Sequence, residues 1–207
     1  MKTIAITGSS GSGKSRISNH LREQGFIVID VDKLAKQLHP LVINEIKETF
    51  GEQYIEDGKI NTKNLALLVF NSRIELDKLN EIMFPVIKNK IEEIIEEYKR
   101  KDTELLFFDI AALFSSGFEK YFDHIVLLLA SRETRLERLI KSRKIDANIA
   151  RIQVDSVHIT VNEILKCSLS ISNEKNENDS KVFEKLTSWI NTLKGGNNLN
   201  DGENRTN

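Results

Sequence analysis

Short apolar runs alternate with stretches of helical spacing along most of this chain. The runs lie at residues 3–7, 26–30, 105–109, 124–130 and 168–172, and β-branched residues are frequent in them. The first four are almost continuously apolar, as strands buried on both faces of a parallel sheet are, and the last alternates apolar and polar positions. The pattern predicts an α/β fold of three layers with a five-stranded parallel sheet.

The interval between the second and third predicted strands, residues 41–100, reads as a set of helices. Asp57-Gly58 marks a turn inside it. Ser72 and Glu75 fit a capping box that begins one helix, and Pro85 is placed to open the next. We expect one domain over residues 1–194, with a core at 1–40, 101–131 and 161–194 and a helical, substrate-covering insertion at 41–100.

A glycine-rich loop joins the first predicted strand to the first predicted helix, which runs from Ser15 to Gln24. Its sequence, Gly8-Ser9-Ser10-Gly11-Ser12-Gly13-Lys14-Ser15, fits G-x-x-x-x-G-K-[ST]. A helix N-terminus presents free N–H groups and positive partial charge, and glycines let the backbone approach phosphate oxygens. We therefore expect a P-loop NTPase fold that binds a nucleoside triphosphate through Gly8, Ser10, Gly11, Ser12, Gly13, Lys14, Ser15 and Arg16.

Two of these side chains have individual roles in that prediction. The Lys14 ammonium group is a mobile cation that can follow charge at the β- and γ-phosphates. The Ser15 hydroxyl group is a hard oxygen ligand, which suits Mg²⁺.

Acidic residues follow two of the predicted strands. Asp30 and Asp32 lie at the end of the second strand, where ligands bind in open parallel sheets. They are candidates for a general base and a substrate contact, while the alternative is that Asp32 caps the helix that follows. Asp109 ends the third strand, where it either helps to hold Mg²⁺ or lies in an ordinary turn.

Residues 132–151 are rich in arginine and lysine, and Ser131 is placed to cap the helix at their start. Guanidinium groups beside a phosphate loop stabilise the negative charge that spreads during phosphoryl transfer. The cluster predicts a lid over 132–160, whereas a single arginine in it also fits a solvated helix with Glu–Arg pairs.

Composition and charge indicate which partners and which cell compartment to expect. The chain has 207 residues, 40% hydrophobic and 29% charged, with a net charge of −1. No global field recruits nucleic acid, and no apolar run is long enough to span a membrane. Cys167 is the single cysteine, which favours a reducing cytoplasm, and we expect it to be buried and inert. We expect a monomer or a weak homo-oligomer with a disordered tail at 195–207.

The order of these elements resembles the dephospho-CoA kinase family, over about residues 2–173. The matching segments are residues 6–15, Ile29 to Asp32 with Leu34-Ala35-Lys36, residues 58–61, residues 65–70, and Asp109 to Phe114. Arg138 falls at the arginine of the family's lid helix, and Asn173 at the asparagine that closes its last strand. The glycine loop alone is shared by many kinases, but this ordered set is more specific.

The resemblance implies ATP-dependent phosphorylation of the ribose 3′-hydroxyl group of dephospho-CoA, the last step of coenzyme A biosynthesis. It implies catalytic roles for Lys14, Asp32 and Arg138, and nucleotide contacts by Arg143 and Asn173. It implies substrate contacts by Asp30, Asp32, Lys36, Phe84 and Leu113, and a Mg²⁺ ion held by Ser15 and Asp109.

Several positions depart from the family pattern. Phe84 stands where the family has histidine, Ala111 and Ser115 replace its proline and glutamate, and Cys167-Ser168 replaces its alanine–aspartate. These positions lie on the predicted substrate side. They leave open another small-molecule kinase of the nucleoside or shikimate type, or a nucleotide-binding module without transferase activity.

Overall fold

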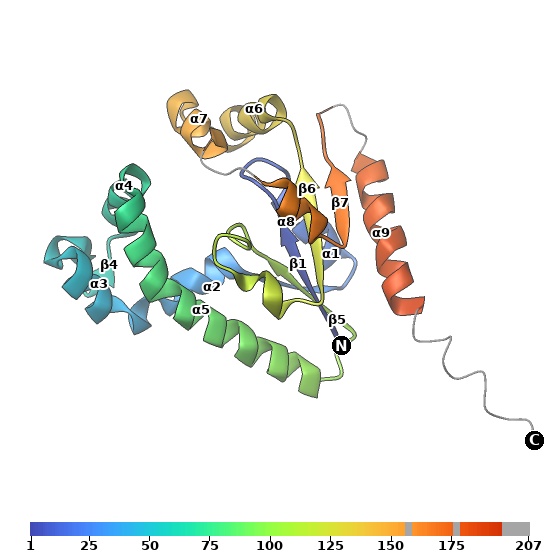
Figure 1. Ribbon diagram of the computed structural model, residues 1–207, viewed down its shortest axis with the longest axis horizontal. Coiled ribbons are helices and arrows are strands. Elements are labelled where there is room, and N and C mark those ends of the chain that lie inside the picture. The colour runs from blue at the N-terminus through green and yellow to red at the C-terminus, as the bar shows by residue number, and fades with distance from the viewer. Residues whose placement is uncertain (156–158, 176–178, 196–207) are drawn as a thin grey trace, which may run out of the picture.

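A parallel sheet with strand order β2-β5-β1-β6-β7 lies at the centre of the molecule (Figure 1). This computed structural model describes residues 1–155, 159–175 and 179–195, apart from the side chains of Phe70, Arg143 and Asp179. The strands are β1 (Lys2–Thr7), β2 (Ile27–Asp30), β5 (Leu105–Asp109), β6 (His124–Leu129) and β7 (Leu169–Ser172). The five predicted strands and their parallel arrangement are confirmed.

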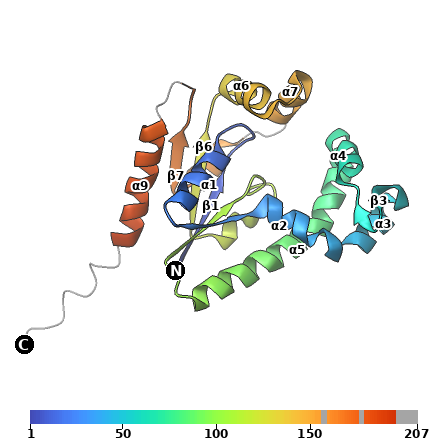
Figure 2. The ribbon, with the colours of Figure 1, turned by 180° about the vertical axis from the view of Figure 1, so that it is seen from behind.

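Alternate side chains of the strands point into two separate hydrophobic cores, one on each face of the sheet. Ala5 and Phe108 pack with α2 (Val31–Leu38) and α5 (Arg73–Arg100). Ile4 and Phe107 pack with α1 (Lys14–Glu23) and α9 (Asp179–Gly195), and Figure 2 shows α1 lying over this face. The predicted three layers are therefore present. One correction concerns β2, which is half-buried because it is an edge strand.

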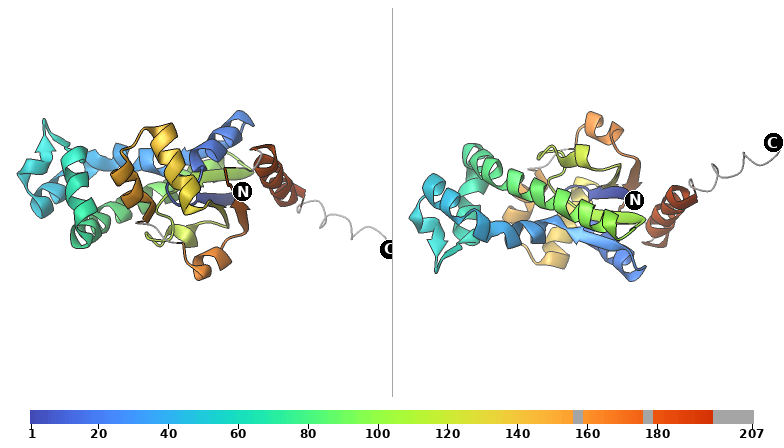
Figure 3. Two further views of the ribbon diagram at one scale, coloured as in Figure 1. Left: turned by 90° about the horizontal axis from the view of Figure 1, so that it is seen from above. Right: turned by 90° about the horizontal axis from the view of Figure 1, so that it is seen from below.

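The segment between β2 and β5 extends away from the sheet (Figures 1 and 3). It contains α3 (Ile43–Phe50), a hairpin of β3 (Ile55–Glu56) and β4 (Lys59–Ile60), α4 (Thr62–Asn71) and α5. The Asp57-Gly58 turn was predicted but the strands it joins were not, because strands this short show no periodicity. Both turn residues have positive φ, 49° and 70°, as tight hairpin turns require.

The helix predicted to open at Pro85 is wrong, since Pro85 lies inside the single long helix α5. Proline removes one backbone hydrogen bond of a helix and usually kinks or ends it. Here Met83 and Ile87, on either side of Pro85, are both buried in the same core. Packing of one apolar stripe along the whole helix therefore outweighs the local cost.

Two helices lie over the end of the sheet where β6 ends (Figures 1 and 3). They are α6 (Arg132–Arg143) and α7 (Ala147–Asp155), which pack together through Leu139, Ala150 and Val154. The short α8 (Val161–Leu165) then leads to β7. Residues 196–207, which make up most of the predicted tail, lie outside the described residues. Among the residues that the structure does describe, no helix is long and apolar enough to cross a bilayer.

Candidate active site

The glycine-rich loop runs from β1 into the first turn of α1, as predicted. Gly11 and Gly13 have φ values of 81° and 102°, which residues with a Cβ rarely adopt. The Lys14 Nζ atom donates a hydrogen bond to the carbonyl oxygen of Gly8 at 2.6 Å, so the ammonium group lies across the loop. Ser15 is exposed. The loop thus presents the start of a helix and one cation at the same place.

Asn173 lies beneath the loop. Its Nδ2 atom donates to the carbonyl oxygen of Ser12 at 2.6 Å, and its Oδ1 atom accepts a hydrogen bond from Arg16 at 2.7 Å. The residue is 1% exposed. The buried amide group thus holds the shape of the loop through Ser12 and Arg16. A contact between Asn173 and nucleotide stays a prediction.

Arginines from two helices approach the loop. Arg138 of α6 has its Nη1 atom 3.4 Å from the carbonyl oxygens of Gly11 and Ser12. The Arg16 guanidinium group lies over the Phe183 ring, 5.6 Å from its centroid, in addition to its bond with Asn173. Arg143 ends α6, but its side chain lies outside the described part of the chain. Arg138 is thus placed where it could reach a phosphate held by the loop.

Other basic residues of α6 make contacts within the protein. Arg132 forms a two-point ion pair with Asp155 of α7, at 2.7 and 2.6 Å. Lys141 pairs with Glu137 one turn away, at 2.7 Å. The Lys141–Glu137 pair fits the alternative of a solvated helix surface, while the Arg132–Asp155 pair joins α6 to α7.

Three carboxylates gather where β2 and β5 end. Asp30 and Asp109 are direct partners in the strand register. The Asp109 Oδ2 atom accepts a hydrogen bond from the Ser18 hydroxyl group of α1 at 2.7 Å. Asp30 is the N-cap of α2, since its Oδ1 atom accepts the backbone N–H of Lys33 at 2.9 Å. Capping therefore belongs to Asp30, and Asp32 in the first helical turn keeps its carboxylate for another role.

The pKa of Asp32 reports how close these groups lie. Desolvation by the surrounding protein raises the pKa of Asp32, the positive charge of Lys14 lowers it, and the charges of Asp109 and Asp30 raise it. Part of the Asp32 surface is exposed, so water still reaches the carboxylate. Asp32 and Lys14 belong to one electrostatic site.

The oxygen atoms at this site suit a hard divalent cation. The Ser15 hydroxyl group and the Asp109 carboxylate are the ligand types that Mg²⁺ prefers. No cluster of three or more His, Cys, Asp or Glu side chains around a metal position exists among the described residues. A donor set this small fits Mg²⁺, which keeps several waters and binds nucleotide phosphates as well.

Comparison with known proteins shows which family this chain belongs to. The chain matches the model of the dephospho-CoA kinases over residues 2–179. It belongs to the dephospho-CoA kinase family. A dephospho-CoA kinase of Fusobacterium nucleatum is 34% identical over 193 residues, which cover 92% of this chain and 97% of the relative. One of Listeria monocytogenes is 32% identical over 193 residues, covering 91% and 96%.

Solved structures agree on the fold. A protein from Thermus thermophilus has a TM-score of 0.78 at 24% identity, with coverage of 92% of this chain and 96% of that one. A dephospho-CoA kinase from Campylobacter jejuni has a TM-score of 0.68 at 23% identity, with coverage of 94% and 98%. The predicted family and the predicted P-loop fold are both confirmed.

The predicted substrate residues lie in different surroundings. Lys36 is exposed on α2, and its charge lowers the pKa of nearby Asp32. Phe84, at the family's histidine position, packs edge-to-face on Phe118 with ring centroids 5.5 Å apart. Leu113 is 0% exposed and lies in the hydrophobic core, and a contact between its side chain and substrate stays a prediction. Leucine in an apolar loop signals core as readily as a binding surface.

Cys167 also lies on the substrate side of the family pattern. Its thiol group donates to the carbonyl oxygen of Glu163 at 3.1 Å, and burial raises its pKa to about 11. A raised pKa keeps the thiol neutral near pH 7. The residue is half-buried and not buried as predicted, and its inertness stays a prediction.

One contributor to the site escaped the sequence reasoning. Ser18, which holds Asp109, is fully buried on the apolar face of α1 between Ile17 and Leu21. A serine within such a stripe is the available signal, because a buried hydroxyl group needs a partner.

Proposed function

We propose that this protein transfers the γ-phosphoryl group of ATP to the ribose 3′-hydroxyl group of dephospho-CoA, giving CoA and ADP. One observation carries the proposal. In a chain of the dephospho-CoA kinase family, Asp32 lies within electrostatic range of Lys14 of the phosphate loop. A carboxylate beside a phosphate-binding cation suits the acceptance of a proton from an alcohol that attacks phosphate.

The loop binds and orients ATP. Backbone N–H groups at the start of α1 receive phosphate oxygens, and the Lys14 ammonium group exchanges the Gly8 carbonyl oxygen for a phosphate oxygen. Arg138 neutralises charge on the group in transfer from the α6 side. Asp32 accepts or orients the proton of the attacking hydroxyl group, and its raised pKa makes it a better base.

Ser15 and Asp109 would hold Mg²⁺, which would supply positive charge to neutralise the phosphates. The remaining attributes rest on composition. We place the protein in the cytoplasm as a monomer or weak homo-oligomer without nucleic-acid or membrane partners, supported by one cysteine and a net charge of −1. The division into core, insertion at 41–100 and lid at 132–160 is part of the same proposal.

A coupled assay tests the function. The purified protein is supplied with ATP, Mg²⁺ and dephospho-CoA, ADP is measured continuously, and CoA is identified by mass spectrometry. Adenosine, AMP and shikimate serve as competing acceptors, and Lys14→Ala is the matched inactive control. We expect CoA from dephospho-CoA alone. Phosphorylation of another acceptor in its place, or ATP binding with no acceptor phosphorylated, would reject the proposal in favour of a different kinase or a binding module.

A further inference from the structure

The carboxylate of Glu174 accepts three hydrogen bonds at the junction between β6 and α6. Its Oε1 atom accepts the backbone N–H of Ser131 at 2.6 Å. Its Oε2 atom accepts the hydroxyl groups of Ser131 and Thr134, at 2.8 and 2.6 Å. Glu174 follows β7, about forty positions along the chain from its partners. The start of α6 is thus tied to the end of β7.

Helix α6 in turn is tied to the phosphate loop. A Cβ atom added to Gly11 would lie 2.7 Å from the carbonyl oxygen of Arg135, so the first turns of α6 pack directly on the loop. Arg138, one turn further on, reaches the carbonyl oxygens of Gly11 and Ser12. A shift of α6 would therefore move Arg138 relative to bound phosphates.

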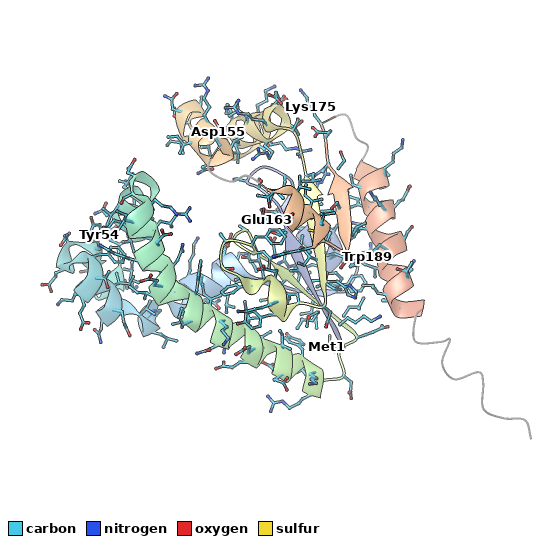
Figure 4. All side chains as sticks on the ribbon, in the orientation of Figure 1. Met1, Tyr54, Asp155, Glu163, Lys175 and Trp189 are labelled. Carbon is cyan, nitrogen blue, oxygen red and sulfur yellow. The ribbon has the colours of Figure 1, made fainter. Side chains whose placement is uncertain are left out.

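Asn173 and Glu174, which we call the β7 clamp, hold both partners at once. Asn173 binds the loop at Ser12 and lies 3.5 Å from Arg138 through its Oδ1 atom, while Glu174 binds the start of α6. Figure 4 labels the next residue, Lys175, beside α6. Lys175 pairs with Glu137 of α6 at 2.8 Å, which extends the same contact.

We infer that Glu174 is a positioning residue for phosphoryl transfer, which fixes α6 so that Arg138 addresses the phosphates on the loop. This inference rests on the proposed function, since its main effect is on turnover. Reacting groups in enzymes must be held closely, and a misplacement of about 1 Å can cost about 10²-fold in rate. Hydrogen bonds from Thr134 and Ser131, with the charge of Arg138, lower the pKa of Glu174 and keep it anionic.

The competing explanation is that Glu174 only stabilises the N-terminus of α6. The chain offers a matched control for that role. Glu163 closes the capping box of α8, where its carboxylate accepts the backbone N–H and the hydroxyl group of Thr160 at 2.7 and 2.8 Å. It has the same hydrogen-bonding chemistry, but at a helix that carries no residue of the loop or of α6. Glu163→Gln should lower stability slightly and leave turnover unchanged.

The test compares Glu174→Ala, Glu174→Gln and Glu163→Gln with the unaltered protein, at a temperature well below each melting transition. Glu174→Ala should lower kcat for CoA formation by about 10-fold to 10²-fold, with KM for dephospho-CoA within about 2-fold. Glu174→Gln should lose less, because its amide oxygen can still accept the Ser131 N–H. If Glu174→Ala fails to fold, the comparison rests on Glu174→Gln, whose kcat should still be lower than that of the unaltered protein.

A double-mutant cycle separates positioning from stability. If Glu174 acts through Arg138, adding Glu174→Ala to Arg138→Ala should lower kcat by less than about 2-fold further. Independent, multiplying losses would overturn the inference, as would a lowered melting temperature with unchanged kcat. If the unaltered protein forms no CoA, the proposed function fails, and ATP affinity by calorimetry decides instead. It should weaken several-fold in Glu174→Ala but not in Glu163→Gln, and equal affinity would overturn the inference.

Discussion

Replacing Asp32 by asparagine should lower the activity of the protein and raise its stability. Asparagine has almost the same shape but cannot accept the proton of the attacking hydroxyl group. Loss of a positioned general base typically costs about 10²-fold to 10⁴-fold in rate. We expect kcat for CoA formation to fall by at least about 10²-fold, while KM for ATP changes little because the loop and Lys14 are intact.

The free energy of unfolding should rise in the same variant. Protein surroundings and two neighbouring carboxylates raise the pKa of Asp32 above its ordinary value of 3.8, despite the opposing charge of Lys14. A raised pKa in the folded state means that the fold binds this proton more tightly than the unfolded chain does. Ionised Asp32 therefore destabilises the fold, and this cost develops as the pH rises through 3.8 to the folded pKa.

The size of this gain is small because Asp32 is exposed and water screens its charge. We expect less than about 1 kcal/mol at neutral pH, or at most about 2–4 °C in melting temperature for a chain of this length. At pH values below 3.8 the difference between the unaltered protein and Asp32→Asn should vanish, since the side chain is then neutral in both. In the unaltered protein, kcat/KM should fall on the acid side through a pKa above 3.8.

The assay pairs steady-state kinetics with thermal unfolding across pH. Asp77→Asn is the matched control, because Asp77 is an exposed acid on α5 that pairs at the surface with Arg73. It should change neither kcat nor melting temperature appreciably. Two results would refute the reasoning. One is near-normal kcat in Asp32→Asn, and the other is a lower melting temperature at neutral pH.

The remaining predictions concern the loop and the thiol. Lys14→Ala should lower kcat by about 10²-fold or more in single-turnover assays, and near-normal transfer would exclude Lys14 from the reaction. Gly13→Ala should weaken ATP binding in calorimetry, because the new Cβ atom would lie 2.2 Å from Asn173 Nδ2. Gly25→Ala is its control, with a φ of 84° but open space around a Cβ, so only strain is added, and equal ATP binding in both variants would exclude the clash. Cys167, with a pKa of about 11, should be alkylated by iodoacetamide at about pH 8 much more slowly in the folded than in the unfolded protein by mass spectrometry.

The strands and the loop could be predicted from the sequence because their signals are local. Leu105 to Asp109 matches β5 at both ends, since a continuous apolar run closed by an acid has few alternative interpretations. The glycine loop is similar, because its φ values and its helix start depend on residues close in sequence. The ordered set of such segments was sufficient for the family, which the comparisons confirm.

Elements that depend on distant packing were predicted less well. Pro85 is a strong local signal for the start of a helix, yet α5 continues through it because the apolar stripe of α5 is buried along the core. The family position of Leu113 predicted a substrate contact, and it gave no sign that the side chain is fully buried in the core. In both cases a tertiary contact outweighs the local preference on which sequence reasoning relies.

The active site shows the same contrast between local sequence signals and distant contacts. Loop residues could be assigned from their own motif, but what holds the loop in shape comes from Asn173, about 160 positions away. Glu174 gave no signal at all, because one acid after a strand is common and its partners Ser131 and Thr134 are ordinary helix-cap residues. The buried Asn173 amide group costs free energy to desolvate, and its hydrogen bonds offset that cost only in the folded arrangement. The part-buried Glu174 carboxylate accepts its three hydrogen bonds in the same arrangement. The loop's geometry is therefore a property of the whole sheet, since β1, β6 and β7 must be in register before the β7 clamp can form.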